Sequence, residues 1–174
     1  MISRETPDVE GQKGFTFLEL TVVILLIGLM VGLATPRIRD TLLTDHLKGT
    51  ARTIVGLVKS LREEAIREQK TYALHFDFEA NRFWVESSSM NEEEQAQARE
   101  KATQLPQGVR VEDIWFRTKG KKMTGETEIR FDRKGYVPHS VIHLGSEDGR
   151  EFTIELSPFL GRVRVVDKYV EFVS

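Results

Sequence analysis

Residues 13–37 read KGFTFLELTVVILLIGLMVGLATPR, and Glu19 is the only charged side chain between Lys13 and Arg37. At about 1.5 Å per residue of helix, residues 15–36 would extend roughly 33 Å, close to the thickness of a bilayer's hydrocarbon core at about 30 Å. The pattern predicts one transmembrane helix. Basic residues flank the run on both sides, so the charges do not fix its orientation.

Glu19 is the fifth residue of this apolar run, counted from Phe15. An ionised carboxylate in hydrocarbon costs on the order of 2 to 3 kcal/mol at mid-span and less near an interface. The carboxylate therefore needs a cation, and the candidates are Lys13, lipid headgroups, or an amino group created by processing. Cleavage after Gly14 would create one, because the new amino group of Phe15 would be positive at neutral pH.

The segment Gly14-Phe15-Thr16-Phe17-Leu18-Glu19, with its apolar helix and Pro36, resembles the amino-terminal segment of type IV pilins and type II secretion pseudopilins. The resemblance implies that prepilin peptidase cuts after Gly14 and that the new terminal Phe15 is N-methylated. It also implies that Glu19 pairs with the terminal amine of a neighbouring subunit during filament assembly. Residues 1–14 would then be a leader peptide on the cytoplasmic side, and Pro36 would be a helix-kinking proline.

Two simpler interpretations of the apolar run stay open. A secretory signal peptide would need a basic start and a small-residue cut site, for which Gly32-Leu33-Ala34 could serve. The run is long for such a peptide, however, and the leader holds three acidic residues against two basic ones. The other interpretation is a membrane anchor that is never processed.

Beyond Pro36 the spacing of apolar residues predicts how the chain continues. From Leu43 to Ala65 they recur every three or four positions, which predicts an amphipathic continuation of the helix over residues 37–70. From Thr71 the period falls to two, which predicts a hairpin over residues 72–85 and strands at 109–116, 127–131, 140–144, 151–156, 162–166 and 169–173. Residues 91–101 are expected to form a solvated helix or loop.

We therefore expect an α+β fold. A long N-terminal α-helix, first transmembrane and then amphipathic, would pack on a C-terminal antiparallel β domain of residues 71–174. The amphipathic part of the helix would cover the apolar face of the sheet. With the resemblance above, this is a pilin-like architecture.

A second resemblance covers the β domain. Four segments follow one another in an order similar to that of GspH/FimT-type minor pseudopilins and minor pilins. They are Leu105-Pro106-Gln107-Gly108-Val109, Ile129-Arg130-Phe131 with Gly135, residues 149–156 and Gly161-Arg162-Val163-Arg164-Val165. Together the resemblances imply a minor pseudopilin of a type II secretion system, in the bacterial inner membrane with its β domain in the periplasm. Its implied partners are other pseudopilins, prepilin peptidase, the inner-membrane assembly platform and, as a further candidate, secreted cargo.

Two alternatives to this function remain. Gly161-Arg162-Val163-Arg164 resembles the DNA-contacting motif of FimT-type pilins, so a minor pilin could bind DNA for uptake through Arg162 and Arg164. Residues 37–174 contain equal numbers of basic and acidic residues, which disfavours nucleic acid as a partner and confines any such site to a local patch. The third possibility is a single-pass envelope protein that never polymerises.

The sequence shows no pattern typical of catalysis. Residues 120–127 nearly match a phosphate-binding loop, but Glu126 stands where the phosphate-contacting lysine must be. His139 and His143 share a strand face without a third ligand, and the chain has no cysteine, so we predict no metal site. We likewise predict no cofactor and no enzymatic activity.

Overall fold

The structure is a computed structural model that describes residues 15–158 and 162–172, without the side chains of residues 32–45. The predicted leader, residues 1–14, lies outside the described residues, as does Gly161 of the arginine motif. The chain divides into two units, Met1–Arg39 and Asp40–Ser174. Helix α1, Phe17–Glu68, contributes residues to both.

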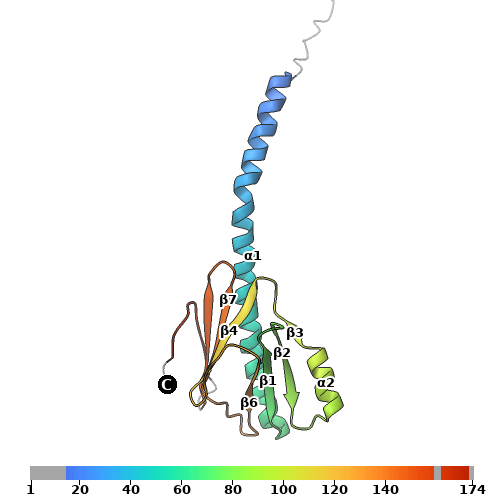
Figure 1. Cartoon of the computed structure of the whole chain (residues 1–174), viewed down its shortest axis with the longest axis vertical. Coiled ribbons are helices and arrows are strands. Elements are labelled where there is room, and N and C mark those ends of the chain that lie inside the picture. Colours follow the sequence, from blue (N-terminus) through green and yellow to red (C-terminus); the bar gives the residue numbers. More distant parts are fainter. Residues whose placement is uncertain (1–14, 159–161, 173–174) are drawn as a thin grey trace, which may run out of the picture. The chain divides into compact units, whose positions relative to one another are not determined.

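Helix α1 is continuous over 52 residues, through the apolar run and the amphipathic pattern that follows it (Figure 1). It ends where the backbone of Gln69 enters the left-handed region at a φ of 53°. The side-chain amide of Gln69 donates to the carbonyl of Ile66 at 2.7 Å. This bond satisfies one of the carbonyl groups that the last turn of a helix leaves unpaired.

Within the described residues, no helix has both the length and the apolar character needed to cross a membrane. The transmembrane helix predicted for residues 15–36 is described only in part, because the side chains of residues 32–45 are not included. Its backbone is helical from Phe17 onward.

The β strands form two antiparallel sheets in the unit Asp40–Ser174 (Figure 1). The four-stranded sheet has the order β3-β2-β1-β6, from Thr103–Gln104, Arg82–Ser87, Tyr72–Asp77 and Glu126–Phe131. The five-stranded sheet has the order β5-β4-β7-β8-β9, from Gly120–Lys122, Val109–Phe116, Ser140–Ser146, Glu151–Leu156 and Val163–Val166. The α+β class and the antiparallel pairing are as predicted.

The core lies between α1 and the inner faces of both sheets. The predicted apolar stripe of α1 is buried at the six positions where side chains are described, namely Leu47, Ala51, Ile54, Val58, Leu61 and Ala65. These side chains join one cluster with residues such as Phe76 and Phe131 of the first sheet and Ile142 and Ile154 of the second. One face of this part of α1 thus supplies apolar cover for two sheets.

Residues 91–101 form a solvated helix, as predicted. Helix α2 spans Glu92–Glu100 and has no buried residue. Asn91 caps it: its side chain accepts a hydrogen bond from the Glu94 N–H, and the Glu94 carboxylate accepts one from the Asn91 N–H, each at 2.9 Å. This capping box satisfies two backbone donors that would otherwise be unpaired.

The strand predicted for residues 169–173 is wrong for the four of them that the structure describes, because residues 169–172 have no strand partner. Side chains replace the ladder instead. Thr153 Oγ1 donates to the carbonyl of Lys168 at 2.7 Å and accepts from the N–H of Val170 at 3.0 Å. The alternation of apolar residues in this segment reflects contact with the outer face of the five-stranded sheet, where Phe172 packs on Trp115 at 5.5 Å between ring centroids.

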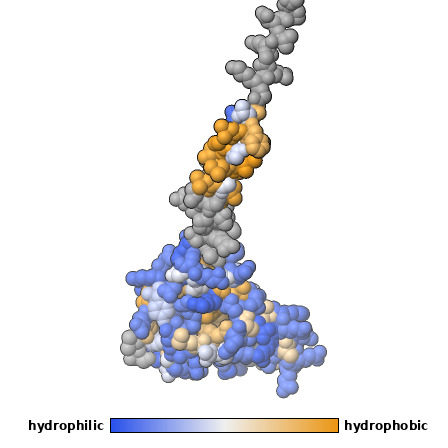
Figure 2. All heavy atoms as spheres, turned by 45° about the horizontal axis from the view of Figure 1, so that its top comes forward, coloured by the Kyte–Doolittle hydropathy of each residue, from blue (hydrophilic) through white to orange (hydrophobic). Residues whose placement is uncertain are grey.

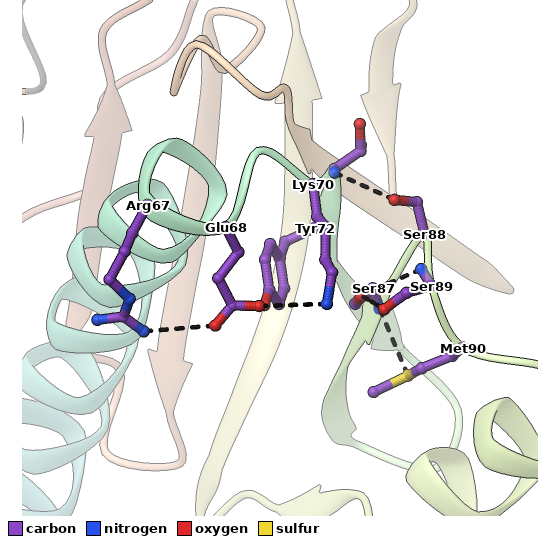
Figure 3. Close-up of polar contacts among 9 residues, drawn as sticks. Arg67, Glu68, Lys70, Tyr72, Ser87, Ser88, Ser89 and Met90 are labelled. Atoms are coloured by element: carbon purple, nitrogen blue, oxygen red, sulfur yellow. Dashed lines mark hydrogen bonds and ion pairs between the residues drawn. The ribbon is translucent and has the colours of Figure 1, made fainter.

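A hydrogen-bond cluster connects the end of α1 to the first sheet (Figure 3). The hydroxyl of Tyr72 donates to Glu68 Oε2 at 2.7 Å, and Lys70 Nζ lies 3.5 Å from the same oxygen. The hydrogen bond to Glu68, with burial, raises the pKa of Tyr72 to about 12. The same bond lowers the pKa of Glu68.

We expect this cluster to make stability fall at high pH. An unfolded tyrosine ionises near pH 10, so the contribution of Tyr72 is complete below about pH 10 and is lost as the pH rises toward 12. Tyr72→Phe should reduce the steepness of this loss. Denaturant unfolding at pH 9 to 11.5 measures it, and Tyr136→Phe serves as a control. Equal slopes for the wild type and Tyr72→Phe would contradict the prediction.

Candidate functional site

The first turn of α1 positions the carboxylate predicted to act in assembly. Thr16 precedes the helix, and its Oγ1 accepts a hydrogen bond from the N–H of Glu19 at 3.2 Å. The carbonyl of Thr16 accepts from the N–H of Leu20 at 3.2 Å. Glu19 thus lies in the first turn, where the helix dipole favours a negative charge.

The backbone of Glu19 is engaged, but its carboxylate is not. The side chain is exposed, and it has no hydrogen bond or ion pair with any residue between 15 and 172 that the structure describes. Lys13, one of its predicted partners, lies among the masked residues 1–14. The carboxylate is therefore available to a cation from outside this part of the chain.

Apolar side chains surround this part of α1. Every described side chain from residue 15 to residue 31 is exposed, and Phe15 and Phe17 are each 86% exposed. Figure 2 shows apolar residues on the visible surface of the segment, in contrast to the mainly hydrophilic surface of the β domain. A helix that is apolar on all sides requires an apolar environment, either lipid or other helices.

The predicted DNA-contacting arginines lie at the last strand of the five-stranded sheet. Arg162 precedes β9, and its carbonyl accepts from the N–H of Ser157 at 3.2 Å. Arg164 is exposed and lies opposite Glu155 of β8 in the register. The carboxylate of Glu155 lies 3.0 Å from Nε2 of His139, and no ion pair between Glu155 and Arg164 is found in the described part of the chain.

A buried polar cluster that the sequence did not predict lies on the outer face of the same sheet. Nδ1 of His143 is 2.7 Å from Oδ1 of Asp113, and both residues are 1% exposed. Nε2 of His143 is 2.9 Å from the carbonyl oxygen of Val170. Each ring nitrogen of His143 thus faces an oxygen atom that can accept a hydrogen bond.

Two further groups bind the second carboxylate oxygen of Asp113. The hydroxyl of Tyr169 donates to it at 3.1 Å, and Lys121 Nζ lies 3.2 Å away. The ring of Tyr169 stacks on His143, with 4.0 Å between centroids. Burial alone would raise the pKa of Asp113, but hydrogen bonds from His143 and Lys121 outweigh it and leave the pKa below its ordinary value.

This cluster anchors the C-terminal segment. Both ring nitrogens of His143 have hydrogen-bond partners, and the hydroxyl of Thr153 is bonded to the backbone of the segment. The cluster therefore presents neither a free base nor an activated nucleophile. His139 binds Glu155 instead, at 3.0 Å. In the described part of the chain, no group of three or more His, Asp or Glu residues is placed to hold a metal ion.

Of the predicted site residues, Gly14 lies outside the described part. Phe15 lies two residues before α1 and Glu19 lies in its first turn, whereas Arg162 directly precedes β9 and Arg164 lies within it. A β-bulge explains why sequence alternation did not reveal the Asp113 cluster. The register of β4 against β7 shifts between Val111 and Asp113, which places Asp113 opposite His143.

The sequence is similar to that of a secretion protein over part of its length. Over 72 residues it is 29% identical to type II secretion system protein H of Pseudomonas aeruginosa. The match covers 41% of this chain, and the chain spans 42% of the length of that relative. No family model matches the chain.

The fold is also found in two solved structures of the minor pseudopilin EpsH from the type II secretion system of Vibrio cholerae. One has a TM-score of 0.51 at 14% identity and covers 71% of this chain and 98% of that one. The other has a TM-score of 0.54 at 13% identity and covers 74% and 98%. The sequence match and the shared fold together confirm the resemblance to GspH-type minor pseudopilins.

Proposed function

We propose that this chain is a minor pseudopilin of a type II secretion system, assembled near the tip of a short periplasmic pseudopilus. The observation that carries the proposal is the exposed carboxylate of Glu19 in the first turn of a helix, in a mainly apolar segment that is otherwise uncharged from residue 15 to residue 31. The fold shared with EpsH supports it. The role is structural: the chain would act by contacts with other pseudopilins and, through its β domain, with cargo.

In this proposal the apolar segment inserts in the bacterial inner membrane with the β domain in the periplasm. Prepilin peptidase removes residues 1–14 and Phe15 is N-methylated. The resulting ammonium group then neutralises Glu19 of a neighbouring subunit. The assembly platform of the inner membrane is the further partner that such a filament requires.

Processing gives the most direct test. In cells with prepilin peptidase, mass spectrometry should find an amino terminus at Phe15 carrying one methyl group, whereas cells without the peptidase should keep Met1. A terminus at Thr35 would support a secretory signal peptide instead. An intact Met1 in cells that contain the peptidase would overturn the proposal.

The DNA-binding alternative is tested separately. Replacing Arg162 and Arg164 together with alanine should leave DNA retention by the full chain unchanged, because the acidic and basic residues beyond Pro36 are balanced. Gel-shift titration at low salt measures it, with Arg110→Ala as an exposed control. Retention that falls only in the double variant would favour the FimT-like function.

A further inference from the structure

A groove of about 510 Å³ lies between α1 and the last strand of the five-stranded sheet. The sheet ends at β9, which pairs with β8 and has no second neighbour among the described strands. Beyond this edge, Arg52, Val55 and Lys59 of α1 line the groove beside the buried stripe of the helix. Gly56 lies there too, and a Cβ atom added to it would meet nothing within 4 Å.

The floor of the groove is apolar. Phe152 of β8 and Val165 of β9 face it together with Val55 of α1. Val165 is 43% exposed, and between residues 46 and 172 few large apolar side chains that the structure describes are as open. A segment placed in the groove would remove this apolar surface from water, which is favourable.

The rim of the groove is positively charged. Lys48, Arg52 and Lys59 border it, and none of them has an ion pair with a described residue. Asp167 is the acidic residue among the lining side chains. From Lys48 to Lys59 the helix rises roughly 17 Å, which an extended strand covers with about five residues.

The edge of β9 shows which sequence would fit. Val163 and Val165 point toward the helix side, while Arg164 between them lies on the opposite face and is exposed. A strand paired with this edge would place apolar side chains beside the two valines and the intervening side chain beside Arg164. An acidic residue at that intervening position would neutralise Arg164.

We propose that the groove binds an extended segment of a partner protein in which acidic residues alternate with apolar ones. The segment adds to β9 as a sixth strand, so that its backbone bonds the open edge while its apolar side chains cover Val55 and Val165. Acidic side chains of the segment meet Arg164 on the face opposite the groove, and the positive charges of the rim attract the acidic segment at longer range. The proposal stands on these contacts and does not rest on the pseudopilin assignment.

The test measures binding of a fluorescent synthetic peptide of alternating glutamate and valine to the full chain in detergent micelles. We expect saturable binding that weakens with salt, and no binding of the peptide with lysine in place of glutamate. Gly56→Leu, which fills the groove, should weaken binding at least about tenfold. Gly49→Leu is the matched control, because Gly49 is also a glycine of α1 with open space around it and does not line the groove.

Charge reversal provides an independent arm. Lys59→Glu and Arg164→Glu should each weaken binding severalfold, whereas Lys122→Glu, on the opposite edge strand β5, should not. Failure of the glutamate peptide to bind, equal binding of both peptides, or full affinity in Gly56→Leu would each overturn the proposal.

Discussion

Replacing Glu19 with glutamine should reduce incorporation of the chain into filaments more than about 100-fold. Glutamine keeps the size of the side chain and removes its charge, so the amine of the neighbouring subunit would be left without its counter-ion in an apolar environment. Loss of one partner of a buried ion pair costs roughly 3 to 5 kcal/mol, and each 1.4 kcal/mol is about a factor of ten. This expectation follows from the proposed function.

The Glu19→Gln variant should keep the structure of the first turn of α1, so that a change in incorporation reports on the lost charge. The hydrogen bond to Thr16 uses the backbone N–H of Glu19, which glutamine retains, so the start of the helix should be unchanged. The measurement is the fraction of chain in sheared filaments relative to membranes. Glu63→Gln, an exposed glutamate on α1, is the control. Normal incorporation of Glu19→Gln would remove the electrostatic basis of the proposal.

Replacing Asp113 with asparagine should lower the free energy of unfolding by about 3 to 5 kcal/mol. The change leaves His143 buried without a carboxylate, and the single amide oxygen of asparagine can accept from His143 or from Tyr169 but not from both. The pKa of Asp113 is depressed in the folded protein, so its contribution is present above the ordinary pKa of about 4 and is lost as the pH falls below it. The variant should therefore show a weaker loss of stability in acid.

Denaturant unfolding of the full chain in micelles, followed by the fluorescence of its two tryptophans, Trp84 and Trp115, measures both effects. Trp115 is suitable because it packs on Phe172 of the C-terminal segment. The control is Glu112→Gln, whose partly exposed ion pair with Arg110 is worth at most about 1 kcal/mol. A loss in Asp113→Asn no larger than in this control would show that the cluster is not a major source of stability.

Much of the fold was predictable from periodicity. The change from a spacing of three or four to a spacing of two at Thr71 marks the end of α1, and the bounds of β4 and β8 match the predicted strands. The division into two sheets was not predictable, because β1 pairs with β6 and β4 with β7, and other strands lie between the two partners in the sequence. Two short strands were not predicted either. Strand β3 has only two residues, and β5 is Gly-Lys-Lys, which has no apolar pattern.

Of the candidate sites, too, one was predictable from the sequence and the other was not. Glu19 was predictable because one charge in a long apolar run needs an explanation whatever the fold. The contact of Asp113 with His143 was not predictable, because these residues are 30 positions apart in the sequence. It also depends on a β-bulge, after which the side chains of β4 point to the opposite faces of the sheet from those that simple alternation predicts. The side-chain anchoring of residues 169–172 was equally hidden, since their alternation is the same as that of a strand.

The C-terminal segment is fastened to the sheet by side chains rather than by a backbone ladder. A chain that stopped before Asp167 would retain β9 and every strand before it, while the ring of His143 would become accessible to water. The segment therefore shields the Asp113 cluster from water, and a reporter should be fused after the segment and not in place of it.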